Sequence, residues 1–293
     1  MNDMKSKNGE FLMLISIAAF SVSDIFDRIA MWKTNPFMAT LIKSSVICLF
    51  VFFVLLFRGF EFKNAKYFVA SGLISEIIGS SSFMYAISHG INVALPTIQT
   101  QVIFTAIFSL LLLKERINRR STLGIAVLVF GLALLNYSRT MGSESTDWVV
   151  GFVFAIFASI GWGMGAVLWK CGIEKGASAN SGLLVHYLTA IISIFFILLL
   201  FDRSAFAVEL KDVGNLTIAA ILDGILGMLA LIHAMKYMSA TRAQALKSIY
   251  PVFACVLAFF IFKEGITSLM FVGIFLASAG VILFELGKRS NKQ

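Results

Sequence analysis

Long apolar runs recur along this chain, and their length restricts the fold more than any other feature. Each run has about 19 to 23 residues, enough for an α-helix that rises about 1.5 Å per residue to cross a hydrocarbon core of roughly 30 Å. Only 14% of the residues are charged, whereas soluble domains carry about 25%. The sequence therefore predicts an all-α membrane protein.

Ten such runs predict ten transmembrane helices. The first run follows Lys5 and Lys7, as a signal peptide does, but its length, its internal charges and the lack of a small-residue cleavage site favour a retained helix. The connections have at most about a dozen residues, so no soluble domain is expected between the helices. The expected spans are Phe11–Trp32, Pro36–Phe57, Tyr67–Ser88, Ile91–Leu113, Ser121–Arg139, Trp148–Lys170, Ala179–Phe201, Gly214–Lys236, Ala240–Phe262 and Thr267–Leu286.

Lysine and arginine residues gather in alternate connections. If the N-terminus is cytoplasmic, 16 of the 24 basic residues fall on the inner face, five fall on the outer face and three lie within helices. Cytoplasmic connections of membrane proteins are enriched in these residues. The pattern therefore predicts a multi-pass protein of the plasma (inner) membrane with N- and C-termini both cytoplasmic. The net charge of +8 is explained by this orientation, and no nucleic-acid partner is expected.

The two halves of the chain resemble each other. A Lys-Glu pair and two glycines recur at one offset of 149 residues, which points to an internal duplication. Because each copy has five helices, an odd number, the second copy crosses the membrane in the opposite direction. We expect two inverted five-helix repeats, residues 1–143 and 144–293, which can open a central site to the two sides in turn. The matched pairs are Lys114 and Lys263, Glu115 and Glu264, Gly124 and Gly273, and Gly131 and Gly280.

The helical cores Ala86–Gly131 and Ala234–Gly280 each have an acidic residue at the end of one helix and two glycines seven residues apart in the next. They resemble the paired EamA-type repeats of the drug/metabolite transporter superfamily. The stretch Ser159–Lys170 is similar to the opening of that repeat, whereas the first copy departs from the family in having Val102 where the second has Pro251. The resemblance covers nearly the whole chain. It implies a ten-helix carrier with a central cavity that moves organic metabolites such as amino acids, sugars, amines or drugs, often outward.

Polar side chains inside the expected helices indicate where a solute binds. A charge at the bilayer centre costs at least about 2.5 to 3.5 kcal/mol unless a partner or a water-filled cavity receives it. Counting residues from each helix start places several polar groups of both halves near one midplane region, where an amino acid or an amine would find partners. The predicted substrate-binding residues are Glu76, Gln99, Gln101, Trp162, His186, Asp223, Lys247 and Tyr250.

Two more charged residues fall at one depth in the outer third of the membrane, Asp24 and Lys43. We expect them to pair with each other, either as a gate or as a simple salt bridge between helices. The neighbouring Asp27 and Arg28 lie closer to the outer surface, so they are expected at the membrane interface.

Several of the site residues have structural alternatives. Asp223 and Lys247 bind a substrate or form an internal ion pair that holds helices together. Glu76 is the candidate for proton coupling, because an acid desolvated near the midplane is suited to that task. His186 shares this role or is a hydrogen-bonded packing residue. Trp162, which glycines flank on both sides, lines a cavity or packs between helices.

Proline residues mark the fourth and ninth expected helices. Pro251 falls inside the ninth, where a proline frees the carbonyl four residues earlier, so the Lys247 carbonyl is expected to be available to a ligand or at a moving joint. Pro96 lies near the start of the fourth helix, where its simplest role is helix initiation.

Enzymatic chemistry in the membrane would need a nucleophile with a base, or clustered metal ligands, at one depth. Three scattered histidines and three isolated cysteines supply neither, and no glycine-rich phosphate loop is present, so no catalytic residue, metal or cofactor is expected. We therefore predict a secondary transporter, an exporter, of a small polar organic metabolite such as an amino acid or amine. A membrane-embedded enzyme and a channel-like protein are the alternatives. The glycine-bearing faces of the fifth and tenth helices pack within the bundle or against a second copy in a homodimer.

Overall fold

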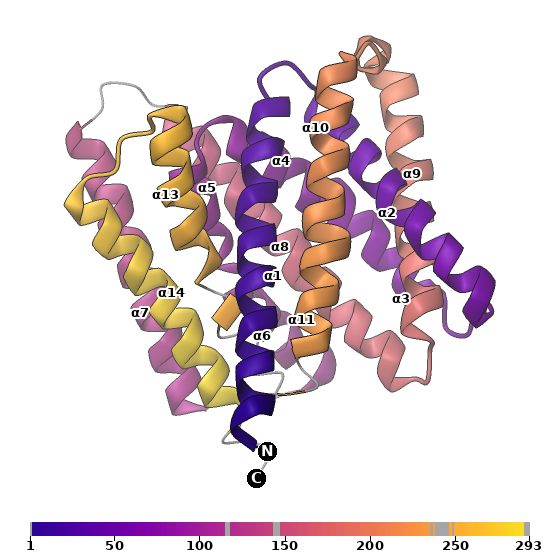
Figure 1. The fold of residues 1–293 in the computed structure, drawn as a ribbon, viewed down its shortest axis with the longest axis horizontal. Coiled ribbons are helices and arrows are strands. Elements are labelled where there is room, and N and C mark those ends of the chain that lie inside the picture. Colours follow the sequence, from indigo (N-terminus) through magenta and orange to yellow (C-terminus); the bar gives the residue numbers. More distant parts are fainter. Residues whose placement is uncertain are drawn as a thin grey trace.

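The protein is a bundle of helices in a computed structural model (Figure 1). The structure describes residues 2–114, 118–142, 147–234, 237, 246–247 and 249–289, and these contain helices, turns and bends without a strand. The predicted all-α fold is confirmed. Six described spans are long and apolar enough to cross a membrane, namely Asn8–Ala30, Pro36–Arg58, Ile91–Leu113, Asp147–Glu174, Ala179–Phe201 and Leu210–Leu231.

The helices follow the expected spans closely, although several spans are divided. Pro36 opens α2, and the Asn35 side chain accepts a hydrogen bond from the Phe37 N–H at 2.9 Å, which fixes the start of that helix. The described helices are α1 (Asn2–Ala30), α2 (Pro36–Arg58), α3 (Lys66–Ser71), the π-helix η1 (Gly72–Ser80), α4 (Ser81–Ser88), α5 (Ile91–Ile98), α6 (Gln101–Leu113), α7 (Arg119–Gly142), α8 (Asp147–Glu174), α9 (Ala179–Phe201), the short 3-10 helix η2 (Arg203–Phe206), α10 (Leu210–Ala220), the π-helix η3 (Ile221–Gly227), α11 (Met228–Ala234), α13 (Tyr250–Phe262) and α14 (Ser268–Arg289).

The third and eighth spans contain π-helical turns at equivalent places. In η1 the carbonyl of Glu76 accepts a hydrogen bond from the N–H of Ser81, five residues later. In η3 the carbonyl of Asp223 accepts one from the N–H of Met228, again five residues later. Wide turns of this kind are rare and often lie at functional sites. Both of them carry an acidic residue that the sequence places near the midplane.

The fourth and ninth spans are broken, but the roles expected for their prolines are wrong. Pro96 lies well inside α5, and the helix ends two residues later at Ile98 before α6 begins at Gln101. Pro251 is instead the second residue of α13, so it starts that helix and does not interrupt it. Lys247 lies outside α13. The break between α5 and α6 places Gln99 and Thr100 on irregular backbone, which in membrane proteins is tolerated where it lines a cavity.

The last helices of the two expected halves, α7 and α14, lie side by side (Figure 1). A Cβ atom added to Gly124 would meet the carbonyl of Gly280 at 2.7 Å, and one added to Gly131 would meet the carbonyl of Gly273, also at 2.7 Å. Because residues late in α14 oppose residues early in α7, the two helices run antiparallel. These glycine faces therefore pack on each other within the chain and are not available to a second copy.

Close packing of α8 places η1 beside the centre of the bundle. The Gly161–Gly165 face of α8 packs closely, because a Cβ at Gly161 would meet the Cα of Gly79 at 2.7 Å. A Cβ at Gly163 would meet the Cβ of Phe104 at 2.8 Å, which brings α6 to the same helix. With no side chains between them, these backbones approach closely enough to define one wall of the central cavity.

The perimeter of the bundle is apolar. Large hydrophobic side chains such as those of Leu111, Phe130, Phe196, Leu200 and Phe260 are exposed. An exposed apolar surface of this extent would cause aggregation in water, whereas lipid tails cover it at no cost. The fold therefore suits a bilayer, as the sequence predicts.

Candidate substrate-binding site

A cavity of about 680 Å³ lies at the centre of the bundle. Its volume is within the range of about 300 to 1,000 Å³ that small-molecule sites occupy. Nine of the ten predicted site residues line it, and His186 lies behind the wall. Sequence reasoning missed Phe20, Ser44 and Tyr187, which also line the cavity. The predicted residues in the wall are Asp24, Lys43, Glu76, Gln99, Gln101, Trp162, Asp223, Lys247 and Tyr250.

Lys43 pairs with two carboxylates, and neither is the expected one. Its Nζ lies 2.5 Å from Asp27 Oδ2 and 2.8 Å from Asp223 Oδ2. The predicted pair of Asp24 with Lys43 is wrong, because the long lysine side chain reaches one helical turn further along α1. The alternative pair of Asp223 with Lys247 is also wrong, since Asp223 takes its cation from α2. Lys43 thus joins α1, α2 and η3.

Asp27 and Arg28, which are expected at the membrane interface, are buried against partners from other segments of the chain. The Asp27 side chain is fully buried, which its bond to the Lys43 ammonium makes tolerable. Arg28 is largely buried and lies 3.5 Å from the Glu264 carboxylate. It also donates a hydrogen bond to the carbonyl of Ser88. Counting residues from a helix start cannot detect such partners from distant helices.

Glu264 holds together three parts of the bundle near the end of α1. Its carboxylate accepts hydrogen bonds from the backbone N–H groups of Ile91, at 3.4 Å, and Asn92, at 3.3 Å. These N–H groups begin α5, and a negative charge at a helix N-terminus is favourable. Together with the ion pair to Arg28, this cluster connects α1, the α4–α5 connection and the segment that follows α13. We call it the outer cluster, because the basic residues predict that this end of the bundle faces outward.

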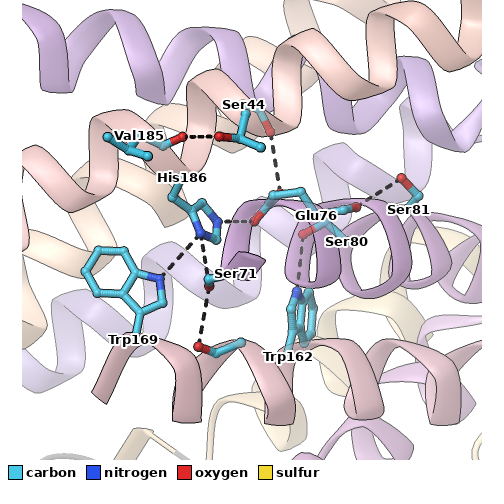
Figure 2. A network of polar contacts seen from close by, with 11 residues as sticks. Ser44, Ser71, Glu76, Ser80, Ser81, Trp162, Trp169, Val185 and His186 are labelled. Atoms are coloured by element: carbon cyan, nitrogen blue, oxygen red, sulfur yellow. Dashed lines mark hydrogen bonds and ion pairs between the residues drawn. The ribbon is translucent and has the colours of Figure 1, made fainter. Parts of the chain in front are cut away.

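The Glu76 carboxylate contacts a histidine ring and a hydroxyl group (Figure 2). Its Oε1 lies 3.0 Å from His186 Nε2, and its Oε2 accepts from the Ser44 hydroxyl at 3.4 Å. The other ring nitrogen, His186 Nδ1, lies 3.4 Å from the Trp169 indole nitrogen and 3.1 Å from the Ser71 hydroxyl. These contacts hold the His186 ring against Glu76.

The two tryptophans of α8 have separate tasks. Trp162 lines the cavity, as one reading predicts, and its Nε1 donates to the Ser80 hydroxyl at 3.2 Å. Trp169 packs its ring on Phe68 at a centroid distance of 4.7 Å while it holds His186. Near the end of its expected span, Trp169 is predicted either to pack or anchor the helix or to stack on a substrate, and the structure shows it packed on Phe68.

Asp24 and Lys247 share another part of the wall. The Asp24 side chain is 6% exposed, and its Oδ2 has no hydrogen-bond partner among the described residues. The Lys247 Nζ lies over the Phe20 ring, 4.0 Å from its centroid. Tyr250 packs on that ring at a centroid distance of 5.9 Å.

The sequence of the chain matches the EamA-like transporter family twice, over residues 7–137 and 149–286. The chain belongs to this family. It is therefore a multi-pass membrane transporter, as the resemblance of its repeats implies. Both matched segments of this EamA-like transporter contribute to the cavity, because Asp24, Lys43 and Glu76 come from the first and Asp223 and Lys247 come from the second.

Individual relatives of this EamA-like transporter agree with the family. Protein LicB of Haemophilus influenzae is 28% identical over 227 residues, which cover 76% of each chain. An uncharacterized transporter of Clostridium kluyveri is 24% identical over 301 residues, covering 97% of this chain and 96% of the relative. A solved crystal structure superposes with a TM-score of 0.65 at 14% identity, and it covers 98% of this chain and 99% of its own. That last likeness concerns the fold alone.

Proposed function

We propose that this EamA-like transporter is a secondary transporter that exports a small organic amine or amino acid through its central cavity by alternating access. The observation that carries the proposal is the cavity, in which charged side chains from both family segments face one volume of about 680 Å³. A charged solute inside a membrane needs partners of opposite sign. This wall offers partners of both signs.

The charge balance around the cavity favours a substrate that carries an amine. Four carboxylates and two lysine ammonium groups lie in the wall or directly behind it. A positively charged group on the substrate reduces this excess of negative charge, whereas an anion increases it. The six charged residues are Asp24, Asp27, Glu76, Asp223, Lys43 and Lys247.

Three pairs of features support two inverted halves, residues 1–143 and 144–293. The π-helices η1 and η3 occupy corresponding places. Lys114 and Lys263 both end an apolar helix in the left-handed conformation, with φ of 55° and 58°. The helices that follow these lysines, α7 and α14, pack antiparallel through equivalent glycines. Halves related in this way can exchange conformations, as alternating access requires.

The outer cluster of Arg28, Glu264, Ser88, Ile91 and Asn92 is the proposed closure of the cavity on its outer side. Its interactions join helices of both proposed halves, so they must separate when the cavity opens outward. The start of α1 and the end of α14 lie at the same end of the bundle (Figure 1). This arrangement agrees with two cytoplasmic termini, which the basic residues favour.

Glu76 is the proposed site of proton coupling. Because its carboxylate contacts the His186 ring and the Ser44 hydroxyl, a proton can bind there without breaking an ion pair with a lysine or arginine. Export would then use the entry of a proton in exchange for the departing amine. Because Glu76 lines the cavity, its carboxylate can meet both the entering proton and the departing amine.

Solute counterflow in proteoliposomes tests the proposal. Vesicles loaded with one amine or amino acid should take up the same labelled solute with saturable kinetics, and sugars and nucleosides should not exchange. Glu76→Gln, Asp223→Asn and Lys247→Met should each slow this exchange, while gel filtration checks that each variant is folded. If all three leave the rate unchanged, the assigned site is wrong, and a conductance without saturation would instead indicate a channel.

A further inference from the structure

The charged groups of the cavity fall into two sets, those with a partner inside the protein and those without one. From this division we infer that the substrate is a zwitterion, whose ammonium group binds Asp24 and whose carboxylate binds Lys247. The inference rests on the proposed function and narrows its substrate class from amines and amino acids to solutes that carry both charges.

The first set has its interactions within the protein. Lys43 holds Asp27 and Asp223 at 2.5 Å and 2.8 Å. Glu76 accepts from His186 and from the Ser44 hydroxyl. A solute that bound to these groups would have to displace existing bonds, so they give it less affinity than groups without partners.

Asp24 is the acid of the second set. Its side chain is 6% exposed, it lines the cavity, and its Oδ2 has no hydrogen-bond partner in the described part of the chain. Leaving a buried carboxylate oxygen without a partner is costly to the fold. Such a cost is typical of a binding residue whose partner arrives with the ligand. A carboxylate selects a positively charged donor, which in an organic solute is an ammonium group.

Lys247 is the base of the second set. Its Nζ lies 4.0 Å from the centroid of the Phe20 ring, and no carboxylate of the described residues lies within the 4.0 Å that defines an ion pair. A cation over an aromatic face is held more weakly than one in a charge-assisted hydrogen bond. The ammonium group is therefore free to turn toward a ligand carboxylate in the cavity that it lines.

Geometry places these two groups at the same part of the wall. Phe20 and Asp24 are one turn apart on α1, so their side chains lie on one face of that helix. Since Lys247 lies over Phe20, its ammonium group is near Asp24 and yet outside ion-pair distance. An α-amino acid can bridge such a gap, because its own two charges are adjacent and each can form a charge-assisted hydrogen bond of about 2.7 to 2.9 Å.

Singly charged solutes fit this pair less well. An amine alone leaves Lys247 without an anion, and a carboxylic acid alone leaves Asp24 without a donor. Only a solute with both groups satisfies both residues, which is how a site with buried polar groups discriminates against analogues that lack one of them.

The test compares three matched sets of probes, the twenty common L-amino acids, the amines that decarboxylation of each would leave, and the acids that lack the amino group. Ligand-dependent thermal stabilisation and counterflow are measured for each. We expect at least one amino acid to bind, with its amine and acid analogues weaker by roughly 10- to 100-fold. Amines that bind as tightly as their amino acids would overturn the zwitterion and leave the proposed amine transporter intact. Binding by none of the three sets would overturn both.

Two variants locate the charges. Asp24→Asn should weaken amino-acid binding by roughly 10- to 100-fold and should leave the unliganded protein at least as stable as the wild type, because it removes a buried carboxylate without a donor. Lys247→Gln should abolish the preference for the amino acid over its amine. Lys33→Gln, which changes an exposed lysine outside the cavity, is the control. A less stable Asp24→Asn protein with unchanged binding would show that Asp24 is structural, and the inference would fail.

Discussion

The two π-helical turns of the bundle have the same backbone form but hold their acids in different surroundings. On η1, Glu76 contacts the His186 ring and accepts a hydrogen bond from Ser44. On η3, Asp223 lies 2.8 Å from the Lys43 ammonium, which also holds Asp27. The comparison teaches that equal backbone geometry does not give equal chemistry. The first acid can gain or lose a proton without breaking an ion pair with a lysine, whereas the second is held by one.

This difference assigns the two turns different tasks in a transport cycle. The Lys43 ion pairs connect α1, α2 and η3, so they stabilise one arrangement of three helices. The Glu76 network connects η1, α2 and α9 through hydrogen bonds with Ser44 and His186 (Figure 2). Removing the charge of Lys43 should therefore lower the stability of the protein most. Changes in the Glu76 network should instead alter how transport responds to pH.

The largest effect is expected from Lys43→Met. This change leaves the fully buried Asp27 carboxylate without its cation, and breaking a buried ion pair from one side costs about 3 to 5 kcal/mol. The melting temperature of the detergent-solubilised protein should fall accordingly. The double variant Lys43→Met, Asp27→Asn should recover part of the loss, because the unpaired charge is then gone. A loss no greater than that of Lys33→Met, an exposed control, would contradict the assigned role.

For Lys43, the sequence predicts the position in the membrane but not the partners. Its place inside a helix, its depth and its need for an anion were all predictable, because apolar runs fix the helices and 1.5 Å per residue fixes the depth. Which of Asp24, Asp27 and Asp223 would pair with Lys43 was not predictable. One turn of helix separates Asp24 from Asp27, and a lysine side chain spans that difference. Only the arrangement of α1, α2 and η3 in the folded bundle selects the partners.

The wall of the cavity was more predictable than its hydrogen bonds. Polar residues such as Glu76, Trp162 and Tyr250 line it because a polar group in an apolar helix has few other places to point. His186 does not line the cavity, because it lies behind Glu76 and contacts its carboxylate. No sequence pattern predicts the wide turns η1 and η3. In η1, Gly79 lies against Gly161 of α8, a contact that exists only in the folded bundle.

A middle-sized effect is expected from Glu76→Gln. The amide still accepts from His186, so the melting temperature should fall by the equivalent of about 1 to 3 kcal/mol, the value of a hydrogen bond to a charged group. Counterflow should become insensitive to pH, because no titrating carboxylate remains on η1. Asp223→Asn serves as the comparison, and its residual transport should keep the pH response. A Glu76→Gln protein with an unchanged pH profile would remove the distinction between the two turns.

A smaller effect is expected at the outer cluster, where a substitution tests whether this cluster closes the cavity toward the outside. Glu264→Gln removes the anion that Arg28 and the start of α5 share, and we expect it to shift the population toward an outward-open state by about 1 to 2 kcal/mol. A cysteine at Met84, which lines the cavity, should then react several-fold faster with a membrane-impermeant maleimide applied from outside. The native cysteines Cys48, Cys171 and Cys255 are first replaced. Equal labelling rates with and without Glu264→Gln would exclude this cluster as a gate.

The smallest effect is expected at an ion pair outside the membrane-spanning helices, which lacks the burial that gives Lys43 its importance. Lys33 donates to Glu209 at 2.7 Å, and both side chains are exposed. The bond lowers the pKa of the Glu209 carboxyl and raises the pKa of the Lys33 ammonium group. The stability that Glu209 contributes is thus present above its unfolded pKa and is lost as the pH falls through its folded pKa.

Solvent and salt screen this pair, so Glu209→Gln should leave the melting temperature at neutral pH almost unchanged. The difference between wild type and variant should shrink further as the sample is acidified below the pKa of Glu209, because the wild-type carboxyl is then neutral too. Melting curves over a series of pH values measure this. A fall in melting temperature comparable to that of Lys43→Met would mean that burial does not set the strength of the ion pairs. The contrast between the buried and the exposed charges of this bundle would then lose its physical basis.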